Sequence, residues 1–324
     1  MDAYGRKIDY LRISITDRCN ERCLYCMPEG YKGWESTRDH LTADEIIRVV
    51  RVAAGLGFRK FRLTGGEPLV RQDILEIVRG IKKVPGVEDI GLSTNGTKLA
   101  PLAGPLRDAG VRAINVSLDA LDSAIYRQIT GGDLNLTLAG IRAANAAGFE
   151  RIKLNCVLMR GVNEGEIWPL VLFAAEHRFP LRLIELMPLT TAEVLTDKNF
   201  LPIGEAMSLL ARRDDLVPQP ETRIGHGPAT YYLLKQTGAL IGFIGALTNL
   251  HFCDHCNKMR LTSDGKIRPC LGNHGELDLR VALRNGGGDD ALREVFLEAL
   301  RLKPLEHQFR NQYQPQRPMT AIGG

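Results

Sequence analysis

The chain has 324 residues, enough to bury a sizeable core as one large domain or as two domains of ordinary size. Charged residues make up 25% and hydrophobic residues 44%, a balance that excludes a disordered or fibrous chain. The net charge of +4 is mild, so we expect no nucleic-acid partner. The most apolar run, 239–247, is too short to span a bilayer, so we expect no membrane association.

The cysteines are grouped in the sequence. There are seven, an odd number, and all but one fall into two tight groups, which is not the pattern of a disulfide framework. In a reducing compartment, grouped thiols usually bind metal. The first residues, MDAYGRKIDYLR, lack the apolar core of a signal peptide, so we expect a cytoplasmic protein.

From residue 9 to residue 187 the sequence alternates short β-rich runs with helical patterns, which predicts six βα units and a parallel sheet. Strands are predicted at 10–15, 59–64, 89–95, 112–118, 151–157 and 181–187. Helices are predicted at 42–56, 72–82, 99–108, 135–147 and 165–176. Thr42, with Glu45 three residues later, predicts a capping box at the start of the first helix.

Polar and apolar side chains alternate along four of these strands. Because successive side chains of a strand point to opposite faces, one face is apolar and the other is polar and largely basic. The polar positions are Tyr10, Arg12, Ser14, Lys60, Arg62, Thr64, Asn115, Ser117, Asp119, Arg151, Lys153 and Asn155. The pattern predicts an α/β fold, a partial (β/α)6 TIM-like barrel whose interior holds a polar ligand. A flatter α/β sheet with solvated strands is the alternative.

After about Pro188 the βα rhythm stops. Proline and glycine are frequent in 202–227, β-rich runs follow at 229–235 and 239–245, and a last helix is predicted at 290–302. We therefore expect two domains. The first, 1–215, is the partial barrel, and the second, 216–324, is a smaller region that closes the barrel and carries the second cysteine group.

The first cysteine group is Cys19, Cys23 and Cys26, spaced C-x3-C-x2-C in the loop after the first strand. In α/β barrels this carboxyl end of the strands carries the chemistry. Four-iron clusters are ordinarily held by four thiolates, so three leave one iron open to a small molecule. The alternative is a structural zinc loop completed by Glu21 or a histidine.

The second group, Cys253, Cys256 and Cys270, is spaced C-x2-C-x13-C and again supplies three thiolates. A second cluster with an open iron is one interpretation. The other is a zinc ribbon, for which His251, His255 and His274 are candidate fourth ligands. The seventh cysteine, Cys156, lies on the apolar face of its strand and is expected in the core.

The segment ITDRCNERCLYCMPEG resembles the signature of the radical S-adenosylmethionine (SAM) superfamily, and TGGEP at the end of the next strand resembles its GGE motif. The resemblance implies a four-iron cluster that cleaves SAM to a 5′-deoxyadenosyl radical. It also implies that Gly65, Gly66 and Glu67 hold the methionine amino group and that Met187 flanks the adenine. Further residues expected to line the SAM site are Tyr25, Ser93, Asn95 and Ser117.

The segment FCDHCNKMRLTSDGKIRPCL, with GPATYY before it and the terminal Gly-Gly after it, resembles the molybdenum cofactor biosynthesis protein A family, the GTP 3′,8-cyclases. This similarity runs along almost the whole chain. It implies conversion of GTP to 3′,8-cyclo-7,8-dihydro-GTP, with a second four-iron cluster at the guanine. It also implies that Gly323 and Gly324 reach into the active site. The residues expected to grip the triphosphate are Arg12, Lys60, Arg62, Lys153 and Arg182.

Lys258 departs from the family pattern, which commonly has arginine there, whereas Arg260 is retained. We expect both to act at the catalytic site, with contacts at Lys258 altered because lysine lacks the planar fork of arginine. The family also implies a flavodoxin- or ferredoxin-like electron donor and a downstream cyclic pyranopterin monophosphate synthase, with a homodimer left open. Competing interpretations are a peptide- or sulfatase-maturing radical enzyme and a zinc-dependent nucleic-acid-binding module.

Overall fold

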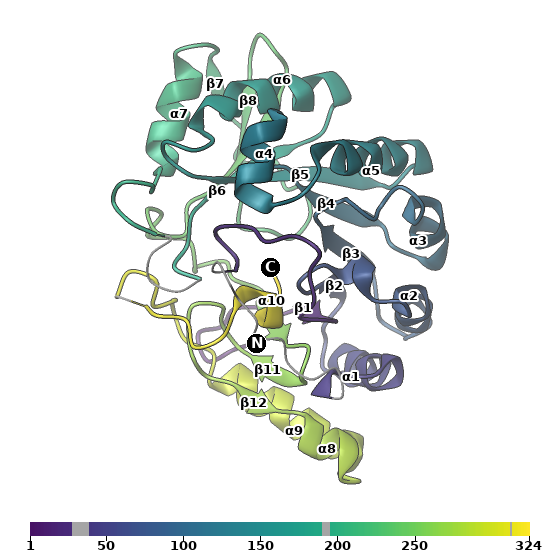
Figure 1. The fold of residues 1–324 in the computed structure, drawn as a ribbon. Helices are drawn as coiled ribbons and strands as arrows, with labels where there is room; N and C mark the ends of the chain where they lie inside the picture. The colour runs from purple at the N-terminus through teal and green to yellow at the C-terminus, as the bar shows by residue number, and fades with distance from the viewer. Residues whose placement is uncertain (28–38, 190–194, 312) are drawn as a thin grey trace.

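The computed structural model describes residues 1–27, 39–189, 195–311 and 313–324, so the last letters of the first cysteine signature lie outside the described residues. The described strands form one open sheet in the order β12-β11-β10-β1-β2-β3-β4-β5-β6-β9-β8-β7. From β1 to β6 the neighbours are parallel and follow chain order, as six βα units require. Figure 1 shows the strands curving around an interior with helices outside them. The partial barrel is thereby confirmed.

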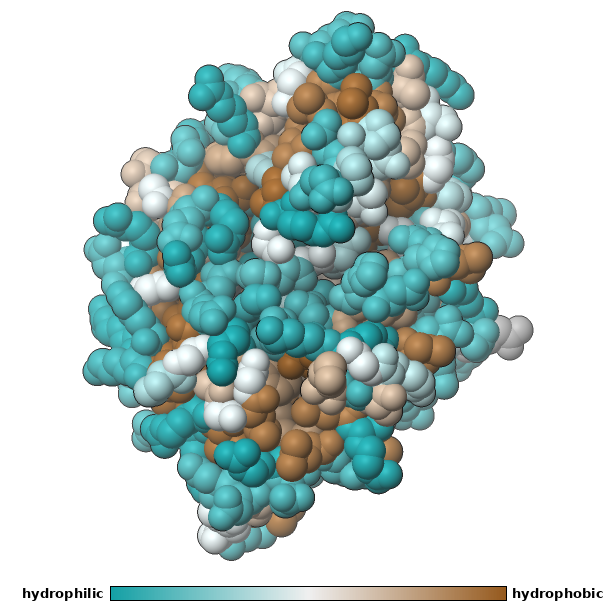
Figure 2. All heavy atoms as spheres, turned by 180° about the vertical axis from the view of Figure 1, so that it is seen from behind, coloured by the Kyte–Doolittle hydropathy of each residue, from teal (hydrophilic) through white to brown (hydrophobic). Residues whose placement is uncertain are grey.

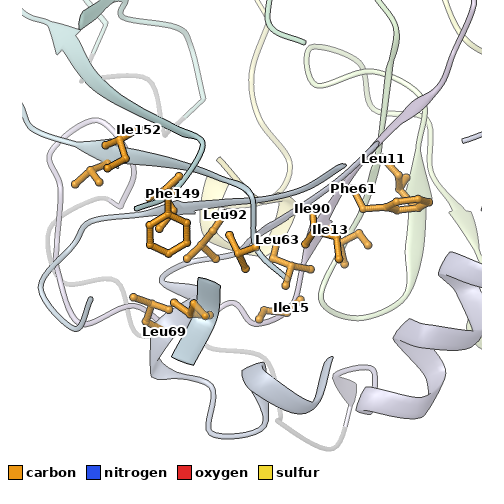
Figure 3. Close-up of a cluster of buried hydrophobic side chains, with 14 of the residues drawn as sticks. Leu11, Ile13, Ile15, Phe61, Leu63, Leu69, Ile90, Leu92, Phe149 and Ile152 are labelled. Carbon is orange, nitrogen blue, oxygen red and sulfur yellow. The ribbon is translucent and has the colours of Figure 1, made fainter. Parts of the chain in front are cut away.

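The six predicted strands are all present, with small shifts at their ends. They are β1 (Tyr10–Ser14), β2 (Lys60–Thr64), β3 (Asp89–Thr94), β4 (Ala113–Ser117), β5 (Arg151–Leu158) and β6 (Leu181–Glu185). Their alternation has the predicted effect: Leu11, Ile13 and Leu63 are fully buried in the main core. Figure 3 shows such side chains from neighbouring strands on the helix side of the sheet. Cys156 is also fully buried in this core, as expected.

The predicted helices cover the outer face of the barrel (Figure 1). They are α1 (Ala43–Gly55), α2 (Ile74–Lys82), α3 (Ala103–Ala109), α5 (Leu134–Ala147) and α6 (Ile167–His177). The capping box is confirmed, because Thr42 accepts from the Glu45 N–H while the Glu45 carboxylate accepts from the Thr42 N–H. Two further helices within residues 39–215, α4 (Ser123–Thr130) and α7 (Ile203–Ala211), were not predicted.

The C-terminal region extends both sides of the same sheet. Strand β10 (Lys258–Leu261) pairs parallel with β1, and β9 (Leu240–Ile244) pairs parallel with β6. The remaining elements are β7 (Leu216–Pro218), β8 (Thr230–Leu234), β11 (Lys266–Arg268), β12 (Leu277–Asp278), α8 (Arg280–Arg284), α9 (Gly288–Arg301) and α10 (Met319–Ile322). Because one sheet crosses residue 215, the division into two domains there stays a prediction.

The surface of the molecule is mixed in character. Seen from behind, it is dominated by hydrophilic residues, with hydrophobic ones in separate groups between them (Figure 2). Within the described ranges, none of the helices has the length and apolar character needed to cross a membrane.

Candidate active site

One cavity of about 370 Å³ brings both cysteine groups together with the polar strand faces. The residues that line it come from β1 to β6, from the loops at their carboxyl ends and from the C-terminal region. All six grouped cysteines are among them: Cys19, Cys23, Cys26, Cys253, Cys256 and Cys270. Residues more than two hundred positions apart in the sequence therefore share one site.

The first cysteine loop is held in place by the end of α4. Main-chain N–H groups of Arg22 and Leu24 donate to the carbonyls of Thr130 and Ile129, over 2.7 and 2.9 Å. The hydroxyl of Tyr25 donates to the carboxylate of Asp119, 2.7 Å away at the end of β4. These bonds fix the second half of the cysteine pattern, between Cys19 and Cys26, and Tyr25 lines the cavity.

The thiols of this loop are buried beside acidic side chains. Burial, opposed by a main-chain hydrogen bond and assisted by the neighbouring Glu67, Cys26 and Glu21, raises the pKa of Cys19 to about 12. Burial also raises the pKa of Cys26 to about 12 and the pKa of Cys23 well above its ordinary value. Metal ligation requires thiolates, so loading this loop must release protons. Three thiols grouped in one loop at a cavity fit the donor set of an iron–sulfur cluster.

Two glycines bring the GGE loop against the cysteine loop. The Gly66 N–H donates to the carbonyl of Thr16 over 2.8 Å, and the Glu67 N–H donates to the carbonyl of Arg18 over 2.7 Å. A Cβ at Gly66 would stand 2.3 Å from the carbonyl oxygen of Arg18. Such a contact is too short, so only glycine allows this approach.

The Glu67 side chain is buried and fully bonded within the protein. Its carboxylate accepts from the Leu69 N–H, the Thr94 hydroxyl and the Asn95 N–H, over 3.0, 2.7 and 2.7 Å. Burial raises its pKa to about 7 in spite of these bonds. Beside it, the buried hydroxyl oxygen of Ser93 has no hydrogen-bond partner among the described residues. An unpaired buried hydroxyl at a cavity is suited to receive a ligand.

The predicted SAM residues Gly65, Gly66, Asn95, Ser117 and Met187 all line the same cavity. Ser93 and Glu67 stand among them. The structure therefore brings the whole predicted set together, and their contacts with SAM stay a prediction.

The second cysteine group borders β10 and β11. Burial raises the pKa of Cys253 and of Cys270. For Cys256 burial acts in the same direction, but Lys303, Lys258, a main-chain hydrogen bond and Arg6 together outweigh it, and its pKa lies below the ordinary value. In the described ranges, no three His, Cys, Asp or Glu side chains form a group that could hold a single metal ion.

Basic side chains line the cavity between the two cysteine groups. Strand register brings three of them side by side, since Arg12 of β1 lies opposite Arg62 of β2 and Arg260 of β10. Lys153 of β5 and Arg182 of β6 extend this surface, and both are buried. Guanidinium groups match phosphate oxygens in pairs, and ammonium groups add point charge.

These cations strongly affect one another. Burial and then the neighbouring Arg182 and Arg62 lower the pKa of Lys153 to about 6. Burial lowers the pKa of Arg182 to about 10, with Tyr231 opposing the shift and Arg62 adding to it. Crowding buried cations together is costly, so this part of the cavity is suited to a highly charged anion.

The C-terminal tail reaches into the cavity, as predicted. The main-chain oxygen of Gly324 accepts from the Thr64 hydroxyl over 2.7 Å and from Arg12, and the Gly323 oxygen accepts from Arg260. Gly323 has φ +88°, and a Cβ there would stand 2.8 Å from the Thr64 side chain. Glycine is needed at this position both for its backbone conformation and for the close approach.

Comparison with known proteins identifies the family. Residues 13–174 match the radical SAM superfamily, and residues 179–309 match the family Molybdenum Cofactor Synthesis C. The GTP 3′,8-cyclase of Moorella thermoacetica is 44% identical over 100% of this chain and 99% of its own. The chain belongs to the GTP 3′,8-cyclase family. The enzymes of the same name from Pelotomaculum thermopropionicum and Pseudomonas fluorescens are 43% and 42% identical, each over 100% of this chain and 99% and 98% of theirs.

Solved structures agree with the fold. Streptococcus suis SuiB superposes with a TM-score of 0.62 at 15% identity, covering 94% of this chain and 68% of its own. A structure of native anSMEcpe with bound AdoMet gives a TM-score of 0.62 at 15% identity, covering 93% and 82%. At this identity the likeness concerns the radical SAM fold alone.

Two residues predicted for substrate binding in this GTP 3′,8-cyclase family member do not line the cavity. Lys60 lies at the start of β2, where its ammonium donates to the carboxylate of Asp9 over 2.8 Å. Gly323 contacts Arg260 through its main chain, but only Gly324 lines the cavity. The two predicted catalytic residues, Lys258 and Arg260, line the cavity.

Several cavity residues were not predicted. One ring nitrogen of His226 lies 3.0 Å from the carboxylate of Asp89, the first residue of β3. Lys303 and His307 lie beside the second cysteine group. None belongs to a strand with polar alternation. The only signal for Lys303 and His307 in the sequence is their place after the last helix, which does not indicate a site.

Proposed function

We propose that this chain converts GTP to 3′,8-cyclo-7,8-dihydro-GTP by SAM-dependent radical chemistry, a step in molybdenum cofactor biosynthesis. The observation that carries the proposal is the single cavity in which six cysteines, the GGE loop and a basic surface meet. Full-length identity of 38–44% to curated GTP 3′,8-cyclases supports it.

The two cofactor sites lie at different places along the cavity. Membership of the radical SAM superfamily implies one four-iron cluster with SAM, for which Cys19, Cys23 and Cys26 are the donors. When bound, these groups supply the one-electron cleavage of SAM that starts removal of hydrogen from C3′ of the ribose. We propose that Cys253, Cys256 and Cys270 hold a second four-iron cluster that orients the guanine. Their shared cavity and grouped thiols support this assignment.

The protein's own residues position the substrate and protect it. Arg12, Arg62, Lys153 and Arg182 hold the triphosphate, and Arg260 with the Gly323–Gly324 tail closes the cavity beside it. Fixing both reactants in contact replaces a bimolecular encounter by a unimolecular step. Enclosure also keeps water and stray hydrogen donors away from reactive intermediates.

We also propose a cellular context for this chain. Seven free cysteines fit a reducing cytoplasm. A flavodoxin- or ferredoxin-like donor would deliver electrons, and cyclic pyranopterin monophosphate synthase would consume the product. A homodimer is the assembly to test in solution.

The activity is tested with anaerobically reconstituted protein, SAM, a reductant and GTP carrying deuterium at C3′. We expect 5′-deoxyadenosine that contains deuterium, formed together with the cyclised nucleotide, and only background formation with ATP. Equal turnover with ATP or with a peptide, in a protein that does not bind GTP, would show that the assignment is wrong.

A further inference from the structure

Lys303 carries a buried ammonium group with an unusual environment. The residue follows α9 and is 3% exposed. Its Nζ donates to two main-chain carbonyls, those of Lys258 at 2.8 Å and Pro269 at 2.7 Å. In the part of the chain that the structure describes, no carboxylate forms an ion pair with it. A buried ammonium without an anion is expensive, so the fold must place negative charge nearby.

The two carbonyls that accept hydrogen bonds from Lys303 belong to the segments that carry cysteines. Lys258 follows Cys256 by two residues, and Pro269 directly precedes Cys270. The ammonium lies close enough to both thiols to interact with them electrostatically, and it lines the same cavity. One side chain therefore joins the two segments that must present Cys256 and Cys270 together.

The third cysteine is tied to the same part of the chain. Arg6 donates to the carbonyl of Cys253 over 3.1 Å, and also to the carbonyls of Pro304 and Leu305 over 2.6 and 2.7 Å. The segment that begins with Lys303 is thus bonded to the surroundings of all three cysteines. Both bonding side chains are cations.

We propose that Lys303 is a positioning residue for the second cysteine group and supplies the fixed counter-charge of an anionic iron–sulfur cluster there. A four-iron cluster held by three thiolates carries net negative charge, and reduction adds one more. A buried cation beside it favours assembly and favours the reduced state, because hydrogen bonds and charge near a cluster set its potential. This inference rests on the proposed function for the existence of that cluster.

The test compares Lys303→Met and Lys303→Gln, which are neutral, with Lys303→Arg, which keeps the charge, in the full chain. Lys235→Met, at an exposed lysine in the turn between β8 and β9, is the matched control. After anaerobic reconstitution, two properties are measured for each variant. The first is the iron and sulfide content, and the second is the midpoint potential of each cluster, with its reduction followed by EPR spectroscopy. Circular dichroism shows which variants fold, and Gln keeps a donor for the carbonyls should Met not fold.

We expect the neutral variants to lose about four irons per chain, or to keep them with a more negative potential for one cluster only. Lys303→Arg and Lys235→Met should match the wild type in both measurements. Full iron content with unchanged potentials in Lys303→Gln would overturn the inference, as would equal loss in Lys303→Arg. A wild type with only one cluster would instead refute the second cluster of the proposed function, so the two failures are distinguishable.

Discussion

Among single residues, Lys153 is one whose ionisation the cavity changes strongly. Its side chain is buried on the basic surface, where its Nζ donates to the carbonyl of Ile224 over 2.9 Å. Burial, Arg182 and Arg62 lower its pKa to about 6, so the free protein holds it largely neutral at pH 7.5. A bound triphosphate adds negative charge and must raise this pKa again. GTP binding is therefore coupled to proton uptake.

We predict that GTP affinity falls as pH rises from about 6, where the free lysine titrates, toward about 10.5, the ordinary pKa of lysine. Affinity falls with rising pH because the complex holds more protons than the free protein between these two values. For one lysine, the affinity can fall by at most about tenfold per pH unit. Calorimetry in buffers of different ionisation enthalpy measures the uptake. Lys153→Met should bind GTP more weakly and lose this share of the proton uptake. Equal uptake in wild type and variant would contradict the prediction.

The sequence predicts cavity residues where strand alternation indicates a face. Arg12, Arg62 and Lys153 are such residues, and the structure places them on one surface. Lys60 follows the same alternation but lies at the start of its strand, far enough down to pair with Asp9. Lys303 could not be predicted, because its role depends on contacts with segments distant in sequence.

Among the elements, the contact between the GGE loop and the cysteine loop is a very close one. It joins the ends of β1 and β2 through two main-chain hydrogen bonds and leaves no space for a side chain at Gly66. The obstructing atoms are main-chain atoms of Asp17 and Arg18, which cannot move away as a flexible side chain would. A Cβ at Gly66 must therefore displace the loop that carries Cys19.

We predict that Gly66→Ala lowers the free energy of unfolding by about 1–3 kcal/mol, the usual cost of overpacking, and weakens SAM binding. Gly104→Ala is the matched control, because its Cβ meets nothing within 4 Å in helix α3 and should stabilise by up to about 1 kcal/mol. Urea unfolding of the metal-free protein measures the free energy of unfolding, and titration of the reconstituted protein with SAM measures SAM binding. A Gly66→Ala variant as stable as Gly104→Ala would contradict the structure of this contact.

Elements with strong local signals were predicted well. The capping box of α1 and the alternation of β1 and β2 are examples. Strand β10 was missed, because it has only four residues and pairs along its whole length with β1, more than two hundred residues earlier, as well as with β11. Helix α7 was missed because it lies in a segment rich in proline and glycine.

For the whole molecule, the two cysteine groups share a cavity but differ in their surroundings. Carboxyl groups of Glu21, Glu67 and Asp119 line the cavity near the first group, while Lys258 and Lys303 stand beside the second. The basic surface lies between these regions, suited to a substrate that reaches both. This arrangement exists only because the C-terminal region adds β10 to the edge of the barrel at β1.

The metal content of the anaerobically reconstituted protein tests this account most directly. We predict about eight irons and as many sulfides per chain, falling to about four when Cys253, Cys256 and Cys270 are replaced by alanine. Replacement of Cys19, Cys23 and Cys26 should leave the other four. Zinc bound at these thiols in place of iron and sulfide would contradict the account.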